Sequence, residues 1–283
     1  MSAKQAAVLG HPIAHSLSPV LHRAAYAALG IDWSYGRFDV DRDELAGFMS
    51  GLDASWGGLS LTMPLKQVVF SLVDHVDPLA EVTGAINTVL FTGTGANRAL
   101  VGTNTDVYGI VTALREGGAR PGLTSAAILG AGATAQSALA ALAELGVVSP
   151  VVYVRSLGRT AEIRMAAGRM GVSPTYELLS KAPAVLASFD VVISTLPPFA
   201  GDEYVDVLRG QRPEALGILL DAAYDPAPTA LIAAWHGLGG ATVSGERMLL
   251  HQAVEQVRLM TGEVGPVAAM GAALDAELAR RRA

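Results

Sequence analysis

The stretch Ala126–Leu145, which reads AAILGAGATAQSALAALAEL, decides the fold of this chain. It begins with a short apolar run typical of a buried strand and ends in a strongly helical pattern. Between the two, Gly130 permits a tight turn, Gly132 lets a backbone come close to a pyrophosphate, and the small Ala135 allows close packing of helix on strand. The helix N-terminus offers free N–H groups to an anion. This order predicts a dinucleotide site, the alternative being a tight strand-to-helix turn without a ligand.

The segment after this helix indicates which dinucleotide is bound. The next predicted strand, Val151–Val154, leads into Arg155, Ser156 and Arg159, with no acidic residue before Glu162. A site for NAD usually places Asp or Glu here to bind the ribose hydroxyls, whereas the 2′-phosphate of NADP requires positive charge. The pattern favours NADP over NAD and over a methyltransferase loop; the alternative is that the arginines are ordinary surface charges. The residues expected to contact the cofactor are Gly130, Ala131, Gly132, Ala133, Thr134, Arg155, Ser156 and Arg159.

Short apolar runs alternate with helical patterns along the chain, which predicts strand-helix-strand units and largely parallel sheets. In the first part we expect strands over Ala6–Gly10, Trp33–Val40, Gly57–Leu61, Ile86–Phe91 and Ala99–Thr103, helices over Pro19–Leu29 (capped by Ser18) and Asp43–Leu52, and a turn at Gly93–Asn97. A helix over Val107–Glu116 and a loop over Gly117–Ser125 precede a second series of strands, Ala126–Gly130, Val151–Val154, Val191–Ser194, Ile218–Asp221 and Ala241–Val243. The last long helix, Met248–Met260, is expected to fold back on the first part.

Length and composition exclude several classes of protein. With 283 residues the chain is long enough for two domains or one large α/β domain. It has no cysteine, which excludes disulfides and thiolate chemistry, and its six histidines show no metal-ligand spacing, so we expect no metal. A net charge of −6 argues against nucleic acid, and Arg280–Arg282 are expected to be a solvated helix end. No apolar run reaches the roughly 20 residues that span a bilayer, and no signal peptide is evident, so we expect a cytoplasmic protein without a membrane partner.

Polar side chains gather at the predicted strand ends of the first hundred residues. Ser16 and Ser18 precede a helix, and Lys66 follows a strand, where Pro64 is suited to start a helix with Lys66 in its first turn. Two more polar runs are Gly84-Ala85-Ile86-Asn87-Thr88 and Gly102-Thr103-Asn104-Thr105-Asp106. Ligands of open α/β sheets bind at strand ends, although capping of helices and turns would explain each polar group taken singly.

Taken together, these motifs resemble the shikimate dehydrogenase family. The matching segments, in family order, are GHPI at 10–13, HSLSP at 15–19, TMPLK at 62–66, GTNTD at 102–106, GAG at 130–132, Asp221 with Tyr224 and Pro226, and Gly245 with Met248, Leu249 and Gln252. The resemblance implies an α/β fold with two domains. Residues 1–105 would form the substrate-binding catalytic domain, residues 106–244 a Rossmann-like NADP-binding domain, and residues 245–283 C-terminal helices that pack back on the substrate domain.

The resemblance also implies roles for single residues. Lys66 and Asp106 match the catalytic pair, and Ser16 and Ser18 would bind the substrate carboxylate. The residues implied to bind ring hydroxyls or to line the ring pocket are Ser60, Thr62, Asn87, Asp106 and Gln252. Gly245, on the cofactor side, and Tyr224, on the substrate side, would lie between nicotinamide and substrate. We also expect Thr195 and Ala222 to contact the cofactor.

Two positions depart from the family pattern. Ser60 stands where Asn is usual, and because one hydroxyl cannot reproduce an amide's hydrogen bonds, we expect the substrate contact there to be lost or water-mediated. Val154-Arg155-Ser156 stands in place of Asn-Arg-Thr, which keeps the arginine and therefore NADP.

The implied activity is the NADP-dependent, reversible reduction of 3-dehydroshikimate to shikimate in aromatic amino acid (chorismate) biosynthesis. Lys66 would be the general acid and base and Asp106 would orient it, the alternative being a structural ion pair. One alternative is an enzyme of the same build that uses quinate, or both acids, with NAD or with both cofactors. Another is a non-catalytic NADP-binding regulatory protein, against which the retained pair argues. We expect a monomer or homodimer acting on a small molecule.

Overall fold

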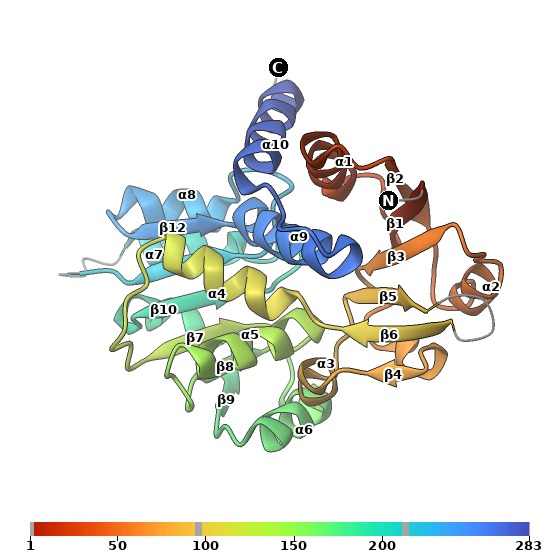
Figure 1. Ribbon diagram of the computed structural model, residues 1–283. Helices are drawn as coiled ribbons and strands as arrows, with labels where there is room; N and C mark the ends of the chain where they lie inside the picture. The colour runs from red at the N-terminus through yellow and green to blue at the C-terminus, as the bar shows by residue number, and fades with distance from the viewer. Residues whose placement is uncertain (1–2, 94–97, 211–214, 283) are drawn as a thin grey trace. The chain divides into compact units, whose positions relative to one another are not determined.

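The computed structural model describes residues 3–93, 98–210 and 215–282. The chain divides into two compact α/β units, each with its own sheet (Figure 1). The first unit combines Met1–Thr105 with Leu249–Ala283, and the second is Asp106–Met248. The first unit is therefore assembled from two stretches that lie far apart in the sequence.

The described part of the first unit contains a six-stranded sheet of mixed direction. Its strands are β1 (Lys4–Gly10), β2 (Trp33–Asp39), β3 (Trp56–Leu61), β4 (His75–Val76), β5 (Thr88–Thr92) and β6 (Ala99–Thr103), in the order β2-β1-β3-β5-β6-β4. β1 is parallel to β2 and β3, but β5 is antiparallel to both β3 and β6. The prediction of a largely parallel sheet is therefore confirmed for the other five described strands, which share one direction. Only β5 departs from it, because the few residues between β5 and β6 allow a hairpin but no helical crossover. Apart from Gly93, the turn predicted at Gly93–Asn97 lies outside the described residues.

The helices of the first unit correct one sequence expectation. They are α1 (Ser18–Leu29), α2 (Leu45–Ser50), α3 (Pro78–Thr83), α9 (Gly245–Thr261, from Leu249 onward in this unit) and α10 (Val267–Arg282), with a 3₁₀ helix at Val68–Leu72. Ser18 was expected to cap α1 but is its first residue, and its side chain makes no capping hydrogen bond. The hydroxyl of Ser16 accepts a hydrogen bond from the Ser18 N–H instead, at 3.4 Å.

The second unit has a parallel sheet with the strand order of dinucleotide-binding folds. Its strands are β7 (Ala126–Leu129), β8 (Val151–Val154), β9 (Thr175–Leu178), β10 (Val191–Ser194), β11 (Ile218–Asp221) and β12 (Ala241–Ser244). Their order is β12-β11-β10-β7-β8-β9, and every pair is parallel. Numbered within the unit this is 6-5-4-1-2-3, so the strand order reverses between β7 and β10, where ligands of such sheets bind.

Helices cover both faces of this second sheet (Figure 1). They are α4 (Asp106–Glu116), α5 (Ala133–Glu144), α6 (Ala161–Met170), α7 (Val205–Arg209) and α8 (Ala230–Gly237). Along β7, Ala126 and Ile128 pack with α4, α5 and α6, while Ala127 and Leu129 pack with α7 and α8. Because both faces are buried at the centre of the sheet, β7, β8, β10 and β11 are mainly apolar runs, as the sequence predicts. Within the described residues, no helix has the length and apolar character needed to cross a membrane.

Candidate functional site

Strand direction brings the polar segments of the first unit to one edge of its sheet. β1 and β3 are parallel, so Gly10 and Leu61 end at the same edge. β5 runs against β3 and begins there, with Thr88 opposite Ser60, and β6 ends there with Thr103 opposite Thr88. The predicted substrate residues on segments that leave this edge are Ser16, Ser18, Thr62, Lys66 and Asn87.

The loop between β1 and α1 is held from β2. Ser16 and Ser18 are both buried within it. The Arg37 guanidinium on β2 donates hydrogen bonds to the carbonyl oxygens of Ala14 and Ser16. Arg37 therefore fixes the backbone that carries both hydroxyls, and no sequence motif pointed to it.

A second polar contact joins the ends of β1 and β2. His11 Nδ1 lies 2.5 Å from Asp39 Oδ1, and both side chains are exposed. This hydrogen bond, together with the charge of Asp39, raises the pKa of His11 above its usual value. The pair ties the start of the serine loop to the neighbouring strand.

The segment that carries Lys66 is a turn rather than the start of a helix. The Leu65 N–H donates to the Thr62 carbonyl at 2.9 Å, and a 3₁₀ helix begins only at Val68. The predicted helix beginning at Pro64 is therefore wrong. The reason is that the Lys66 carbonyl accepts from the Ile86 N–H at 2.9 Å, so it is engaged by the strand edge instead of by a helical N–H. Lys66 is half-buried and stands beside the segment that leads into Asn87.

The structure brings Asn87 and Gln252 together from positions far apart in the chain. Asn87 is fully buried, and its Nδ2 donates to Gln252 Oε1 at 2.9 Å. Its Oδ1 accepts from the Thr105 N–H at 2.8 Å. Asp106 follows Thr105 directly, is fully buried and begins α4 in the second unit. Since Lys66 and Asp106 belong to different units, their pairing remains a prediction.

Ser60 faces protein groups inside the first unit. It is 4% exposed, accepts a hydrogen bond from the Tyr35 hydroxyl at 2.6 Å and donates one to Gln256 Oε1 at 2.8 Å. Its only proton is thus engaged within the protein. No sequence motif pointed to Tyr35 or Gln256, although Gln256 lies one helical turn after Gln252 and therefore on the same face of α9.

The second unit has the geometry that a dinucleotide requires at the end of β7. Gly130 has φ of +109°, and a Cβ there would lie 2.4 Å from Thr195 Oγ1. A Cβ on Gly132 would meet no protein atom within 4 Å, so the space beside the N-terminus of α5 is open. Ala135 is fully buried, as close packing of α5 on the sheet predicts. Thr195 follows β10, so the turn and Thr195 flank the point where strand order reverses.

The other predicted cofactor residues also lie at carboxyl ends of strands. Arg155, Ser156 and Arg159 follow β8 and are exposed, and in the described part of the chain neither guanidinium forms a hydrogen bond or ion pair. After β11, a Cβ on Gly245 would lie 2.4 Å from the Ala222 carbonyl oxygen, so this close backbone approach requires glycine. The candidate residues from β7, β8, β10, β11 and β12 therefore share one edge of the sheet.

Asp221 holds the loop that carries Ala222 and Tyr224. Its carboxylate accepts from the Thr229 hydroxyl at 2.7 Å and from the Ala223 N–H at 3.4 Å. Burial raises the pKa of this carboxyl group above its usual value. These two hydrogen bonds tie both ends of the loop between β11 and α8 to Asp221.

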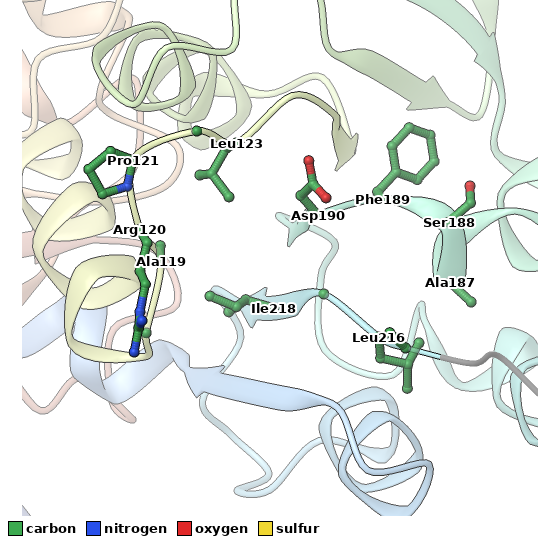
Figure 2. Close-up of a pocket in the computed structure, with 14 residues that line it drawn as sticks. Ala119, Arg120, Pro121, Leu123, Ala187, Ser188, Phe189, Asp190, Leu216 and Ile218 are labelled. Atoms are coloured by element: carbon green, nitrogen blue, oxygen red, sulfur yellow. The ribbon is translucent and has the colours of Figure 1, made fainter.

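A cavity of about 380 Å³ lies at the opposite edge of the same sheet (Figure 2). It is bordered by Leu123, Asp190 and Ile218, which stand at the amino ends of β7, β10 and β11. The Asp190 carboxylate accepts hydrogen bonds from the N–H groups of Thr124 and Ser125, which joins the residues before β10 to those before β7. Because dinucleotides bind at carboxyl ends, this cavity is not the cofactor site. Among the described residues, no cluster of three or more His, Asp or Glu side chains is arranged to hold a metal ion.

The second unit has a parallel sheet with a glycine-rich turn where the strand order reverses, and the first is a separate α/β unit with polar residues at one edge of its sheet. Together they define a nicotinamide-dependent dehydrogenase with its own substrate domain. A family model described as the shikimate dehydrogenase substrate binding domain matches residues 8–89, and one described as the shikimate 5'-dehydrogenase C-terminal domain matches residues 245–274. The chain belongs to the shikimate dehydrogenase family.

Relatives agree with this assignment over almost the whole chain. The protein named shikimate dehydrogenase (NADP(+)) from Rubrobacter xylanophilus is 37% identical, with 95% of each chain covered. The crystal structure of Mycobacterium tuberculosis shikimate dehydrogenase superposes with a TM-score of 0.84 at 38% identity, covering 97% of this chain and 99% of that one. A Thermus thermophilus shikimate 5-dehydrogenase, described in complex with NADP(H) and shikimate, gives a TM-score of 0.80 at 29% identity, covering 96% and 99%.

Proposed function

We propose that this chain catalyses the NADP-dependent, reversible reduction of 3-dehydroshikimate to shikimate, a step of aromatic amino acid (chorismate) biosynthesis. The observation that carries the proposal is the agreement, over 95% of its length, with a relative named for this substrate and cofactor. The polar edge of the first unit and the glycine-rich turn of the second supply a candidate site for each.

We assign residues 1–105 to substrate binding, 106–244 to NADP, and 245–283 to helices that complete the substrate domain. Ser16 and Ser18 are proposed to bind the carboxylate. The groups proposed to contact the ring or line its pocket are Thr62, Asn87, Asp106, Tyr224 and Gln252. Ser60, with its proton engaged by Gln256, is proposed to support this pocket from behind.

The residues of the second unit fit NADP. The open space at Gly132 and the N–H groups at the start of α5 suit the pyrophosphate, because a helix N-terminus attracts anions. Arg155 and Arg159 supply positive charge for the 2′-phosphate. Thr195, Ala222 and Gly245 line the remaining edge of the sheet.

The protein's own contribution to the reaction is positioning and proton transfer. When bound, NADPH supplies the hydride. Reduction of a ketone also requires a proton at the developing alkoxide oxygen, and we propose that the Lys66 ammonium donates it while its positive charge stabilises the alkoxide. Asp106 is proposed to orient Lys66 and to bind a neighbouring hydroxyl. The Ile86 N–H donates a hydrogen bond to the Lys66 carbonyl and so fixes the backbone from which the Lys66 side chain extends.

Gly130→Ala is expected to weaken cofactor binding by about tenfold or more and to lower the melting temperature, because the new Cβ would meet Thr195 Oγ1 at a backbone φ that L-residues avoid. The matched variant Gly132→Ala, whose Cβ meets no protein atom, is expected to weaken NADPH binding without changing the melting temperature. Fluorescence titration of NADPH and thermal unfolding measure both. Wild-type affinity in both variants would contradict the assignment of this turn.

Arg155→Ala combined with Arg159→Ala is expected to raise KM for NADP by roughly tenfold to a hundredfold, because charge-assisted hydrogen bonds to a phosphate are among the stronger polar contacts. KM for NAD, which lacks the 2′-phosphate, should not rise. Arg120→Ala, an exposed arginine at the opposite edge of the sheet, serves as control and should change neither value. Equal increases in KM for NADP and NAD would show that the arginines do not bind the 2′-phosphate.

Initial rates of cofactor reduction, with shikimate and quinate each paired with NADP and NAD, test the function as a whole. Turnover confined to shikimate and NADP is the expected result. Comparable rates with quinate or NAD would support the alternative of a quinate-using enzyme. Tight NADPH binding with no turnover on either acid would support the alternative of a non-catalytic regulatory protein.

We further propose that the enzyme acts in the cytoplasm on this small molecule alone, as a monomer or homodimer. Its net charge of −6 disfavours a nucleic-acid partner, and the reaction needs none. Sedimentation of the purified protein would establish the oligomeric state.

A further inference from the structure

A continuous chain of buried polar side chains runs through the first unit and ends at Gln252. Beginning at the far end, its members are Tyr35, Ser60, Gln256, Thr88, Asn87 and Gln252. All of them are buried except Gln252, which is half-buried. They come from β2, β3, β5, the residue before β5, and α9.

The backbone N–H of Thr105 determines which way the side-chain amide of Asn87 faces. The Thr105 N–H can only donate, and it donates to Asn87 Oδ1 at 2.8 Å. Asn87 must therefore turn its Nδ2 toward Gln252, whose Oε1 accepts at 2.9 Å. The remaining group of Gln252 is its Nε2, which makes no hydrogen bond to the described residues. Gln252 is thus set to act as an N–H donor.

Gln256 is the branching point of the chain. Its Nε2 donates to the Thr88 hydroxyl at 2.9 Å and to the Asn87 backbone carbonyl, which can only accept, at 3.5 Å. Its Oε1 must then face the other way, where it accepts from Ser60 at 2.8 Å and from His22 at 3.1 Å. Both ends of the side chain are fully engaged in a residue that is 3% exposed.

The direction of every hydroxyl follows from this orientation. Thr88 accepts from Gln256 and therefore donates to Asn87 Oδ1, at 2.9 Å. Ser60 donates to Gln256 and accepts from Tyr35. Since a buried polar group without a partner is costly, reversing one member would leave others unpaired, so the chain has one favoured arrangement.

We propose that Gln256 is a positioning residue of this enzyme, which acts through Thr88 and Asn87 to present Gln252 Nε2 as a hydrogen-bond donor to an acceptor oxygen of the ring substrate. The inference rests on the proposed function and deepens it. Gln256 does not itself contact the substrate. Ser60 belongs to the same device, because its hydroxyl holds the Gln256 oxygen in place.

The test removes hydrogen bonds from the middle and from the far end of this series of polar side chains. Thr88→Val keeps the shape of the side chain but removes the hydroxyl between Gln256 and Asn87, Thr88→Ser keeps that hydroxyl, and Gln256→Met removes the branching point. Tyr35→Phe removes only the outermost link. Calorimetry gives Kd for shikimate without cofactor, steady-state kinetics give KM for each substrate, and thermal unfolding gives the melting temperature.

Thr88→Val and Gln256→Met are expected to raise Kd and KM for shikimate by about tenfold, the effect of losing one well-placed hydrogen bond, and to leave KM for NADP within about twofold of wild type. Thr88→Ser should restore wild-type affinity, and Tyr35→Phe should change it by less than about threefold. If Gln256→Met does not fold, the isosteric Thr88→Val decides.

A purely structural role would lower the melting temperature and leave Kd for shikimate unchanged in Thr88→Val, which would overturn the proposal. So would a Tyr35→Phe effect as large as that of Thr88→Val, because Ser60 and His22 still hold Gln256 Oε1 in that variant, and the effect would then reflect a general loosening of the fold. A wild-type protein that binds no shikimate overturns this proposal and the proposed function together, whereas wild-type binding with unaffected variants overturns this one alone.

Discussion

Lys66→Met is expected to lower kcat by about 10³-fold, within the range that loss of a general acid produces. The reason is chemical: hydride addition to a carbonyl creates an alkoxide, and a thioether offers it neither a proton nor positive charge. KM for shikimate should change much less than kcat, because the carboxylate and ring contacts remain. Steady-state kinetics in both directions of the reaction measure this.

The fold of this variant should survive. The structural contact that Lys66 makes with Ile86 is through its backbone carbonyl, which methionine retains. Lys181→Met, which removes an exposed lysine paired with Glu177 in the second unit, serves as control and should keep wild-type turnover. Lys66→Met with kcat within about tenfold of wild type would favour a structural ion pair and would remove Lys66 from the mechanism.

Features encoded by neighbouring residues could be predicted from the sequence. The turn after β7 is one: the local order of strand, glycine-rich turn and helix predicts a tight turn at Gly130, a close backbone approach at Gly132 and close packing at Ala135, and the structure has a positive φ, open space and full burial at these positions. Strand direction was harder to predict. β5 was expected as a strand, but its antiparallel pairing depends on the connection to β6, and the two-residue β4 and half-exposed β9 carry too weak an apolar pattern to be noticed.

The polar chain behind the candidate substrate site shows where sequence reasoning stops. Ser60 drew attention only because it departs from the family pattern, and nothing local indicates that its partners are Tyr35 and Gln256. His22 and Gln256 stand 234 positions apart, so only the tertiary structure brings them together. Long-range hydrogen bonds between buried groups leave no periodicity in a sequence, whereas amphipathic helices and strands do.

The second large effect that we expect concerns His22 and acid stability. Burial lowers the pKa of His22 from 6.5 to about 4. Between these values the unfolded chain takes up a proton at His22 that the folded protein does not. The contribution of His22 to the free energy of unfolding is therefore fully present above pH 6.5 and is lost as the pH drops toward about 4. The difference corresponds to about 3 kcal/mol of unfolding free energy. The surroundings explain why the ring stays neutral: it is fully buried and stacks on Tyr35 with ring centroids 3.9 Å apart, and the hydrogen bond to the uncharged Gln256 offsets only part of the cost of burying a charge.

His22→Phe separates this effect from other acid-sensitive groups. Phenylalanine can keep the stack on Tyr35 but loses the hydrogen bond to Gln256, so the variant should be less stable than wild type at pH 7 by about 1 kcal/mol. Near pH 4.5 it should be the more stable protein, because it has no imidazole to protonate on unfolding. Carboxylates whose pKa is held low, such as Asp190 and Glu277, affect both proteins equally and cancel in the comparison.

Urea unfolding from pH 4.5 to 7 measures the two curves, which should cross. His236→Gln, which removes an exposed imidazole, is the matched control and should follow wild type throughout. Parallel curves for His22→Phe and wild type would mean that His22 titrates alike in the folded and unfolded states, which its complete burial makes incompatible with this structure. A crossing would also show that the imidazole hydrogen-bonded to Gln256 is neutral in the folded protein.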